Sequence, residues 1–321
     1  MRTGFLDSFH FVGPGGGSRL VLPSLPLVVA VLLLLDGCAP ERSSQTVEDS
    51  LTSGRIRLAC APEAAVLVRR ELEGFQTMYP QASFDFREAP SGDAVRALFA
   101  DQADLAVITR ELEPEERAAA VRGRLELEGF PFARDGVVVL ANPANPIENL
   151  TIEDLRDIYA GRVADWKVLG SQAGKIVPVI PPPQSDLTAF FAQKVMNGED
   201  LHAAAEYALN DSDVVKRVLA DRGAIGFASL GVAPHGARVL RLAALKGLPY
   251  WKPDLEAVYR GDYPLTRFFN LYVRTAGKRL AHGVITWTTS MDGQALVKDA
   301  GLVPTAVPVR FVRRSPMLST H

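Results

Sequence analysis

Histidine and cysteine are scarce in this sequence, which has 5 histidines and 2 cysteines among 321 residues. The histidines lack partners at spacings typical of metal ligands, and neither C-x-x-C nor H-E-x-x-H occurs. The nucleophile motif G-x-S-x-G is also missing. These absences predict a protein with no metal site, no cofactor and no enzymatic activity.

An excess of charge of either sign is absent as well. The 35 Lys and Arg residues nearly balance the 37 Asp and Glu residues, which gives a formal net charge of −2. A nearly neutral chain offers no electrostatic footprint for DNA or RNA. No nucleic-acid partner is therefore expected.

Long apolar runs are rare too. The run from Leu27 to Leu35 is shorter than the roughly 20 residues of a membrane-spanning helix, and with Arg19 before it the run is typical of a signal peptide. The Leu35-Asp36-Gly37-Cys38 segment is similar to a bacterial lipobox, whose cysteine is lipidated after cleavage. We therefore predict a lipoprotein signal peptide over residues 1–37, a lipidated Cys38 and a flexible polar tether over residues 38–54. A plain signal peptide with an incidental cysteine is the alternative.

This N-terminal segment also decides the expected location and the state of the second cysteine. A lipidated protein is expected in the bacterial periplasm or cell envelope, anchored to a membrane. Cys60 would then have no partner, and the alternation of residues 56–60 points it inward as a small buried side chain. If Cys38 is not lipidated, a Cys38 to Cys60 disulfide is the alternative.

Strand and helix patterns alternate from residue 55 onward. Val137 to Leu140 are consecutive apolar residues, mostly β-branched, which indicates a strand buried on both faces in a parallel sheet. Thr151 with Asp154 three residues later predicts a capped helix that ends near Ala160. A last helix is expected over about residues 280–298. Further strands are expected at residues 56–60, 84–86, 105–108, 176–180, 223–230 and 268–273.

This alternation predicts two lobes with a cleft between them. The chain crosses between lobes near residues 130–140 and returns near residues 262–272. The expected division is residues 55–135 plus 263–311 for lobe 1 and 136–262 for lobe 2, followed by a tail over residues 312–321. The predicted class is α/β, with a mainly parallel sheet flanked by helices in each lobe and a ligand site in the cleft.

Five sequence blocks stand in a fixed order along the chain. They are residues 103–110 (ADLAVITR), residues 132–170 with a DG strand and an NP-x-NP loop, residues 223–230 (GAIGFASL), residues 263–267 (YPLTR), and Gly293-Gln294 with residues 301–304 (GLVP). In this order they resemble the substrate-binding proteins of phosphate ABC importers. The resemblance implies a type II periplasmic-binding-protein fold and an ABC permease as partner.

The resemblance also implies an anion site between the lobes, built from hydroxyls, backbone N–H groups and an arginine. Ser91 and Thr109 match hydroxyl positions of the family, and Arg110 matches its arginine. In the second lobe only Ser185 clearly matches the family's Arg-x-x-Gly-Ser-Gly-Thr-Arg segment. Asp135, near the crossing, is a further candidate for the cleft.

Two acidic residues depart from the family pattern. Glu63 ends a Cys60-Ala61-Pro62-Glu63 segment where the family has Gly-Ser-x-Thr, and Asp186 stands in the second-lobe segment. If both face the cleft they repel an anion, at about 3 kcal/mol each for a separation of about 5 Å and an effective dielectric near 20. If they cap helices and point outward, this repulsion is absent and an anion is again an expected ligand. Both interpretations are open from the sequence.

Two functions follow. The first is a non-enzymatic solute-binding lipoprotein that captures a small ligand for ABC transport, either an anion at Ser91, Arg110 and Ser185 or a polar or cationic solute at Glu63 and Asp186. In this hypothesis phosphate itself is a doubtful ligand. The second is a signalling or interaction protein that keeps the fold and serves a different membrane partner.

Overall fold

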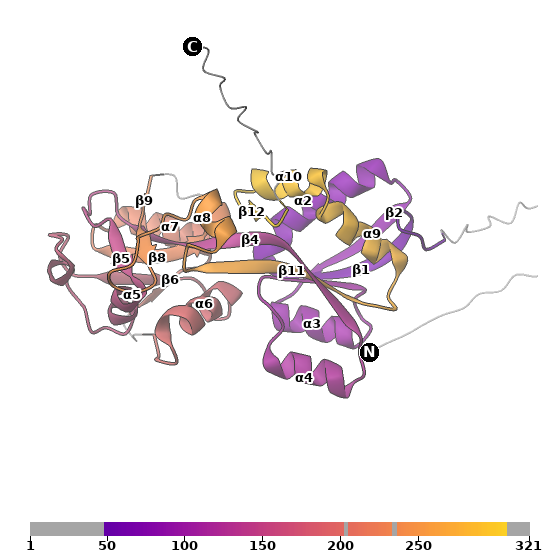
Figure 1. Ribbon diagram of the computed structural model, residues 1–321, viewed down its shortest axis with the longest axis horizontal. Helices are drawn as coiled ribbons and strands as arrows, with labels where there is room; N and C mark the ends of the chain where they lie inside the picture. Colours follow the sequence, from indigo (N-terminus) through magenta and orange to yellow (C-terminus); the bar gives the residue numbers. More distant parts are fainter. Residues whose placement is uncertain (1–47, 202–204, 233–235, 307–321) are drawn as a thin grey trace, which may run out of the picture. The chain divides into compact units, whose positions relative to one another are not determined.

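The computed structural model describes residues 48–201, 205–232 and 236–306 (Figure 1). The predicted signal peptide, Cys38 and the tail over residues 312–321 lie outside the described residues. The described residues belong to one compact unit. In the part of the chain that is described, no helix has the length and apolarity needed to cross a membrane.

The first lobe is built on three parallel strands, in which β1 (Gly54–Cys60) lies between β2 (Ala82–Glu88) and β3 (Leu105–Ile108). Helix α2 (Pro62–Met78) follows β1, and α3 (Ser91–Phe99) follows β2. Because the three strands run the same way, their carboxyl ends lie at one edge of the sheet. Glu63, Ser91 and Thr109 all follow these ends.

The helices of the first lobe cover both faces of its sheet. One core cluster joins β1 to α2 and to α9 (Arg279–Thr288), and another packs α3 against the opposite face. Figure 1 shows α2, α9 and α10 (Met291–Asp299) on one side, with α3 and α4 (Pro114–Arg122) on the other. The prediction of a single last helix over residues 280–298 is wrong, because Ser290 caps a new helix, α10.

Two long strands run from one core to the other. They are β4 (Leu127–Ala141) and β11 (Thr266–Arg274), which pair antiparallel. Phe132 of β4 belongs to the first core, whereas Val137 and Val139 belong to the second. The strand is buried as predicted, but β4 is antiparallel to all four strands with which it pairs, so its placement in a parallel sheet was wrong. Burial on both faces does not require a parallel partner.

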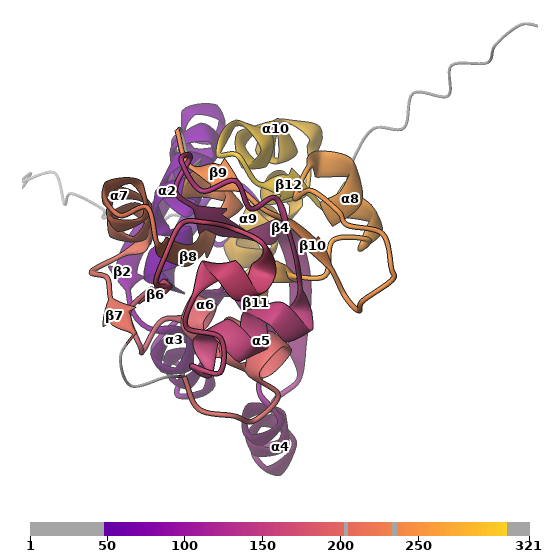
Figure 2. The same ribbon diagram turned by 90° about the vertical axis from the view of Figure 1, so that its left-hand side faces the viewer.

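The second lobe has its own parallel strands, with β6 (Val177–Ile180) between β7 (Glu206–Tyr207) and β8 (Ala224–Ser229). Gly226 of β8 permits close packing, since a Cβ there would approach Val214 Cγ1 to 2.5 Å. Figure 2 shows this lobe end-on. Its helices α5 (Ile152–Tyr159) and α6 (Asp186–Phe191) face the viewer, and α7 (Asp211–Ala220) is at the side.

Local predictions in this lobe hold. Thr151 and Asp154 form the predicted capping box at the start of α5, and the helix ends before Ala160. The elements that were not predicted are β7, α7, β5 (Asn149–Thr151), β9 (Arg238–Val239), β10 (Arg241–Ala243), α8 (Leu255–Arg260) and β12 (Val303–Pro304). Short helical turns lie at Trp166–Leu169, Ala192–Met196 and Leu230–Val232. Cys60 is buried with a free thiol, as predicted.

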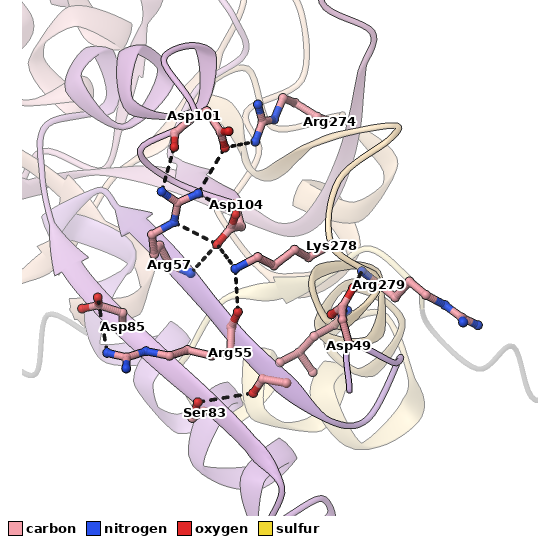
Figure 3. Close-up of polar contacts among 12 residues, drawn as sticks. Asp49, Arg55, Arg57, Ser83, Asp85, Asp101, Asp104, Arg274, Lys278 and Arg279 are labelled. Atoms are coloured by element: carbon pink, nitrogen blue, oxygen red, sulfur yellow. Dashed lines mark hydrogen bonds and ion pairs between the residues drawn. The ribbon is translucent and has the colours of Figure 1, made fainter. Parts of the chain in front are cut away.

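A charged network holds the far edge of the first lobe (Figure 3). Asp104 precedes β3 and accepts hydrogen bonds from the backbone and side chain of Arg57 on β1. Lys278, just before α9, also donates to Asp104 over 3.2 Å. Asp101 pairs with Arg57 and with Arg274 at the end of β11. The network therefore joins β1, β3, β11 and α9 away from the predicted cleft.

Candidate functional site

Donor groups of the first lobe converge on one carboxylate of the second lobe. Ser91 Oγ donates a hydrogen bond to Asp186 Oδ2, and Thr109 Oγ1 lies 2.7 Å from the same oxygen. Arg110 Nε lies 3.6 Å from Asp186 Oδ1. Asp186 is the first residue of α6, whose Leu187 and Phe191 are buried in the second core. Asp186 thus brings a negative charge to the three groups that the resemblance assigns to an anion.

Glu63 reaches the same place from the start of α2. Its Oε2 lies 2.8 Å from Thr109 Oγ1, and its Oε1 accepts a hydrogen bond of 3.4 Å from the backbone N–H of Leu187. Glu63 and Asp186 therefore both face the junction between the lobes. The interpretation in which they point outward as helix caps is wrong for these two side chains.

The Thr109 hydroxyl contacts both carboxyl groups but has a single proton. It can donate to one carboxyl only, so the other must supply its own proton to the Thr109 oxygen. Burial raises the pKa of Glu63, and the nearby Asp186 charge raises it further, against opposing effects of Arg267 and Thr109. The raised pKa favours the neutral form of Glu63, and in that form Glu63 can donate to the Thr109 oxygen while Thr109 donates to Asp186.

Arg110 is already neutralised by other carboxylates. Its Nη1 and Nη2 donate to the two oxygens of Glu116 over 2.7 and 2.8 Å. Glu113 is a second acidic neighbour, with its Oε1 3.5 Å from Arg110 Nε. Such a two-point pair with Glu116 fixes the guanidinium and leaves only its Nε side turned toward Asp186. Less positive charge is then available for an incoming anion.

Asp135 forms a buried ion pair where β4 and β11 cross between the lobes. Arg267 Nε donates to Asp135 Oδ2 over 2.8 Å, with 2% of the arginine and none of the aspartate side chain exposed. The other oxygen of Asp135 accepts from Ser229 Oγ and from the backbone N–H of Leu230. Both carboxylate oxygens of Asp135 therefore have hydrogen-bond partners within the protein. Asp135 stabilises the junction, and the prediction that it contacts the ligand is not supported by its position.

Arg267 and Asp211 are charged groups near the site that the sequence analysis missed. Arg267 Nη1 and Nη2 are buried and have no hydrogen-bond partner among the described residues. Burial alone lowers the pKa of Arg267, but Asp135, Glu63 and Asp211 outweigh burial and raise it. Asp211, at the start of α7, has a pKa raised mainly by burial. The YPLTR block contains Arg267, and this was the only available signal.

Ser185 does not join the group. Its Oγ accepts the backbone N–H of Thr188 over 3.1 Å and caps α6, and it also contacts the Thr188 hydroxyl. The structure therefore brings together Ser91, Thr109, Arg110, Glu63 and Asp186, with Asp135 next to them through Arg267. Cys38, the predicted lipidation site, lies outside the described residues.

Two surface hollows occur away from this junction. One, of about 340 Å³, is lined by Leu51, Phe75, Tyr79 and Trp287 on the α2 and α9 side of the first lobe. The other is lined by residues of β2 and α3, including Arg87 and Asp93. In the described ranges, no cluster of three or more His, Cys, Asp or Glu side chains is placed to hold a metal ion.

Comparisons with known proteins match most of the chain. The family described as the PBP superfamily domain matches residues 43–292. The phosphate-binding protein PstS of Bacillus subtilis (strain 168) is 24% identical over 298 residues, which cover 89% of this chain and 94% of that protein. Protein SphX of Synechococcus elongatus is 23% identical over 309 residues, covering 91% and 88% of the two chains.

Solved structures share the fold at low sequence identity. An ABC-type phosphate transport receptor from Vibrio cholerae superposes with a TM-score of 0.67 at 22% identity, covering 77% of this chain and 99% of the other. PstS from Borrelia burgdorferi gives a TM-score of 0.61 at 17% identity, covering 78% and 98%. These likenesses confirm the predicted two-lobed periplasmic-binding-protein fold. The exact lobe boundaries, residues 55–135 plus 263–311 against 136–262, stay a prediction.

Proposed function

Because the chain belongs to the PBP superfamily, we propose that it is a non-enzymatic solute-binding protein of the phosphate-importer type. It takes a small solute between its lobes and presents it to an ABC permease. Relatives named phosphate-binding protein PstS, which match most of the chain, support this role. Fold and family alone do not choose the ligand, so the ligand is argued from the side chains.

One observation carries the proposal. The hydroxyls of Ser91 and Thr109 and the guanidinium of Arg110 come from three positions on the first lobe, and all are directed at one group from the second lobe, Asp186. These donors converge at the junction between the lobes, where a solute with acceptor groups that displaces Asp186 would contact both lobes. Charged partners make such hydrogen bonds stronger and directional.

The charge at the junction disfavours phosphate. Asp186 occupies the donors that a phosphate oxygen would use, and Glu116 holds Arg110. A like charge at about 5 Å costs about 3 kcal/mol at an effective dielectric near 20, which is roughly hundredfold in affinity. The ligand is therefore a small polar solute that tolerates or displaces Asp186, and phosphate is a weak ligand.

A second function is favoured by the same contacts. Ser91, Thr109 and Asp186 satisfy one another without a solute, which suits a protein that keeps the fold but delivers a signal to a different membrane partner. The two functions differ in their partners. Permease and ATPase genes next to this gene, with copurification of the permease, support import, whereas a neighbouring sensor protein supports signalling.

Calorimetric and thermal-shift screening of the protein tests the binding function. The screen includes inorganic phosphate, sulfate, phosphonates, short carboxylic acids and small amines. We expect one class to bind with a stoichiometry of one and to lose at least tenfold in affinity in Ser91→Ala, which removes a hydroxyl donor worth about 1.5 kcal/mol or more. Thr286→Ala, on the α9 surface, is the matched control and should bind normally. Failure of every class to bind would contradict the proposal.

Export and lipid anchoring are also part of the proposal. They rest on the apolar run before Asp36 and on Cys38. Mass spectrometry of the membrane fraction is expected to find a diacylglyceryl group on Cys38, and Cys38→Ala is expected to release the protein into the soluble periplasmic fraction. An unmodified Cys38 in a membrane-free wild-type protein would contradict the anchor and leave the binding function to the solute screen.

A further inference from the structure

The Asp186 carboxylate is bound as if it were a ligand. Among the described residues, Ser91 Oγ hydrogen-bonds only to Asp186, and Thr109 Oγ1 only to Asp186 and Glu63. Ser91 and Thr109 are 3% and 0% exposed, so water cannot easily replace these partners. A carboxylate presents two oxygens and a negative charge, which is the chemistry that hydroxyl and guanidinium donors recognise in a free oxyanion.

We propose that Asp186 is a tethered ligand: its carboxylate fills the oxyanion-binding donors of Ser91, Thr109 and Arg110 and holds the lobes together without a solute. Any anion that enters must displace it. Asp186 is therefore the residue that sets the specificity of the junction against free oxyanions. The expected effect of Asp186 on phosphate binding rests on the proposed function. The expected effect of Asp186 on the distance between the lobes does not.

The position of Asp186 in the chain suits this role. It is carried by α6, which is fixed to the second core by Leu187 and Phe191, while Ser91 and Thr109 belong to elements of the first lobe. Only β4 and β11 cross between the two cores as long strands. Breaking the Asp186 contacts therefore frees α6 from α3 and β3 and leaves the crossing strands as the hinge.

Glu63 completes the contact as a proton donor. Thr109 has one proton and lies within hydrogen-bond distance of both carboxyls. When Glu63 is neutral it can therefore donate to Thr109 while Thr109 donates to Asp186. If Glu63 ionises, this donor is lost and a second negative charge appears next to Asp186. The contact should therefore weaken as the pH rises.

The surroundings of Glu63 favour its neutral form overall, although one neighbouring group, Arg267, opposes this. Arg267 of β11 stabilises the ionised form, whereas Asp186 of α6 and Asp211 of α7 oppose it, and burial is the largest effect and opposes it too. The net pKa of Glu63 is raised above its ordinary value of 4.5. An acid with a raised pKa in the folded state stabilises that state at low pH, and the stabilisation is lost as the pH rises through the raised pKa.

A distance measurement on the full chain without added solute tests the tether. Spin labels are placed at Val121→Cys and Leu209→Cys, which replace exposed residues of the first and second lobe. Cys38→Ser excludes labelling of any unmodified Cys38, and Cys60 is buried. We expect one narrow distance in the parent protein and a longer, broader distribution in both Asp186→Asn and Asp186→Gly. Asp292→Asn, an exposed acid in the first turn of α10, is the control and should keep the parent distance.

A second experiment measures the affinity of the same variants for inorganic phosphate by titration. Loss of the tethered charge should make phosphate binding to Asp186→Gly roughly hundredfold tighter than to wild type, with no gain in Asp292→Asn. An unchanged distance in both Asp186 variants would overturn the tether, whatever phosphate does. A longer distance without any gain for phosphate would support the tether and contradict solute binding at these donors.

The same distance measured at several pH values distinguishes a tether that depends on the protonation of Glu63 from a contact that does not. The parent distance should lengthen as the pH rises above 4.5 and through the raised pKa of Glu63. Glu63→Gln keeps an N–H donor for Thr109 but cannot ionise, so its distance should stay narrow at every pH. Equal pH responses of the parent and Glu63→Gln would overturn the role given to Glu63.

Discussion

Arg267 Nε and Asp135 Oδ2 are joined over 2.8 Å in the interior, where β4 and β11 pass between the lobes. Both side chains are almost completely buried, and the remaining arginine nitrogens have no partner among the described residues. The pair is therefore the main charge compensation at the hinge. A buried ion pair contributes little compared with apolar packing, but loss of one member leaves an uncompensated charge.

Asp135→Asn should accordingly lower the free energy of unfolding by about 3–5 kcal/mol, because Arg267 remains buried without its counter-charge. Urea denaturation at neutral pH measures this change. Glu256→Gln is the matched control, since Glu256 pairs with Arg260 on the surface of α8 and both side chains are exposed. The control should change stability by less than about 1 kcal/mol. Equal effects of the two substitutions would contradict the role given to the buried pair.

Asp104 gives a prediction at acid pH. Burial by itself raises its pKa, but hydrogen bonds from Arg57 and Lys278 outweigh burial and hold the pKa below 3.8. A lowered pKa stabilises the folded state above 3.8, and this is lost as the pH falls through the folded value. Asp104→Asn should cost about 2 kcal/mol at neutral pH and flatten the acid side of the stability curve.

Asp85→Asn provides the comparison for this network. Asp85 lies 3.8 Å from Arg55 and is exposed, so its substitution should change stability by less than about 1 kcal/mol and leave the acid dependence unchanged. Urea midpoints measured over a series of acidic pH values distinguish the two variants. An acid dependence that survives in Asp104→Asn would show that the network of Figure 3 is not its source.

The contribution of Glu71 to stability depends on pH in the opposite direction to that of Asp104. Glu71 is buried on α2, and its carboxyl oxygens make no hydrogen bond of good geometry among the described residues. Burial raises its pKa from 4.5 to about 8, against a smaller opposing effect of the nearby Trp287 N–H. Stability from the neutral carboxyl is present below pH 4.5 and is lost as the pH rises to about 8. The loss is on the order of 3 kcal/mol after allowance for relaxation.

Glu71→Gln should remove this loss, so that its unfolding free energy stays nearly constant over the same pH interval. Glu73→Gln, on the exposed face of the same helix, is the control and should retain the wild-type slope. Urea unfolding of the three proteins across the interval measures the effect. A wild-type slope in Glu71→Gln would rule out Glu71 as the titrating group.

Local elements could be predicted because their signals are local. The Thr151 capping box depends on residues three apart, and the buried run from Val137 to Leu140 depends on side-chain type alone. The direction of β4 relative to its neighbours depends on chain crossings far away in sequence, and so the parallel prediction failed there. The two helices after β11 were merged because Ser290 was not recognised as a cap.

The site was only partly predictable for the same reason. Ser91, Thr109 and Arg110 follow strand ends, which the sequence orders correctly along one sheet edge. The direction of Glu63 and Asp186 depends on how the lobes meet, which a single sequence does not contain. Arg267 was visible in a motif, but its link to Asp135 needs the register of β4 with β11.

Calorimetric titration of the wild-type protein with inorganic phosphate at neutral pH tests the central claim most directly. The claim is that Asp186 already occupies the donors of Ser91 and Thr109 at a junction built to hold a small solute. We predict weak phosphate binding, with a dissociation constant in the high micromolar range or above. Tight submicromolar binding by the wild-type protein would contradict the claim, because phosphate would then gain its full binding energy with the Asp186 carboxylate present.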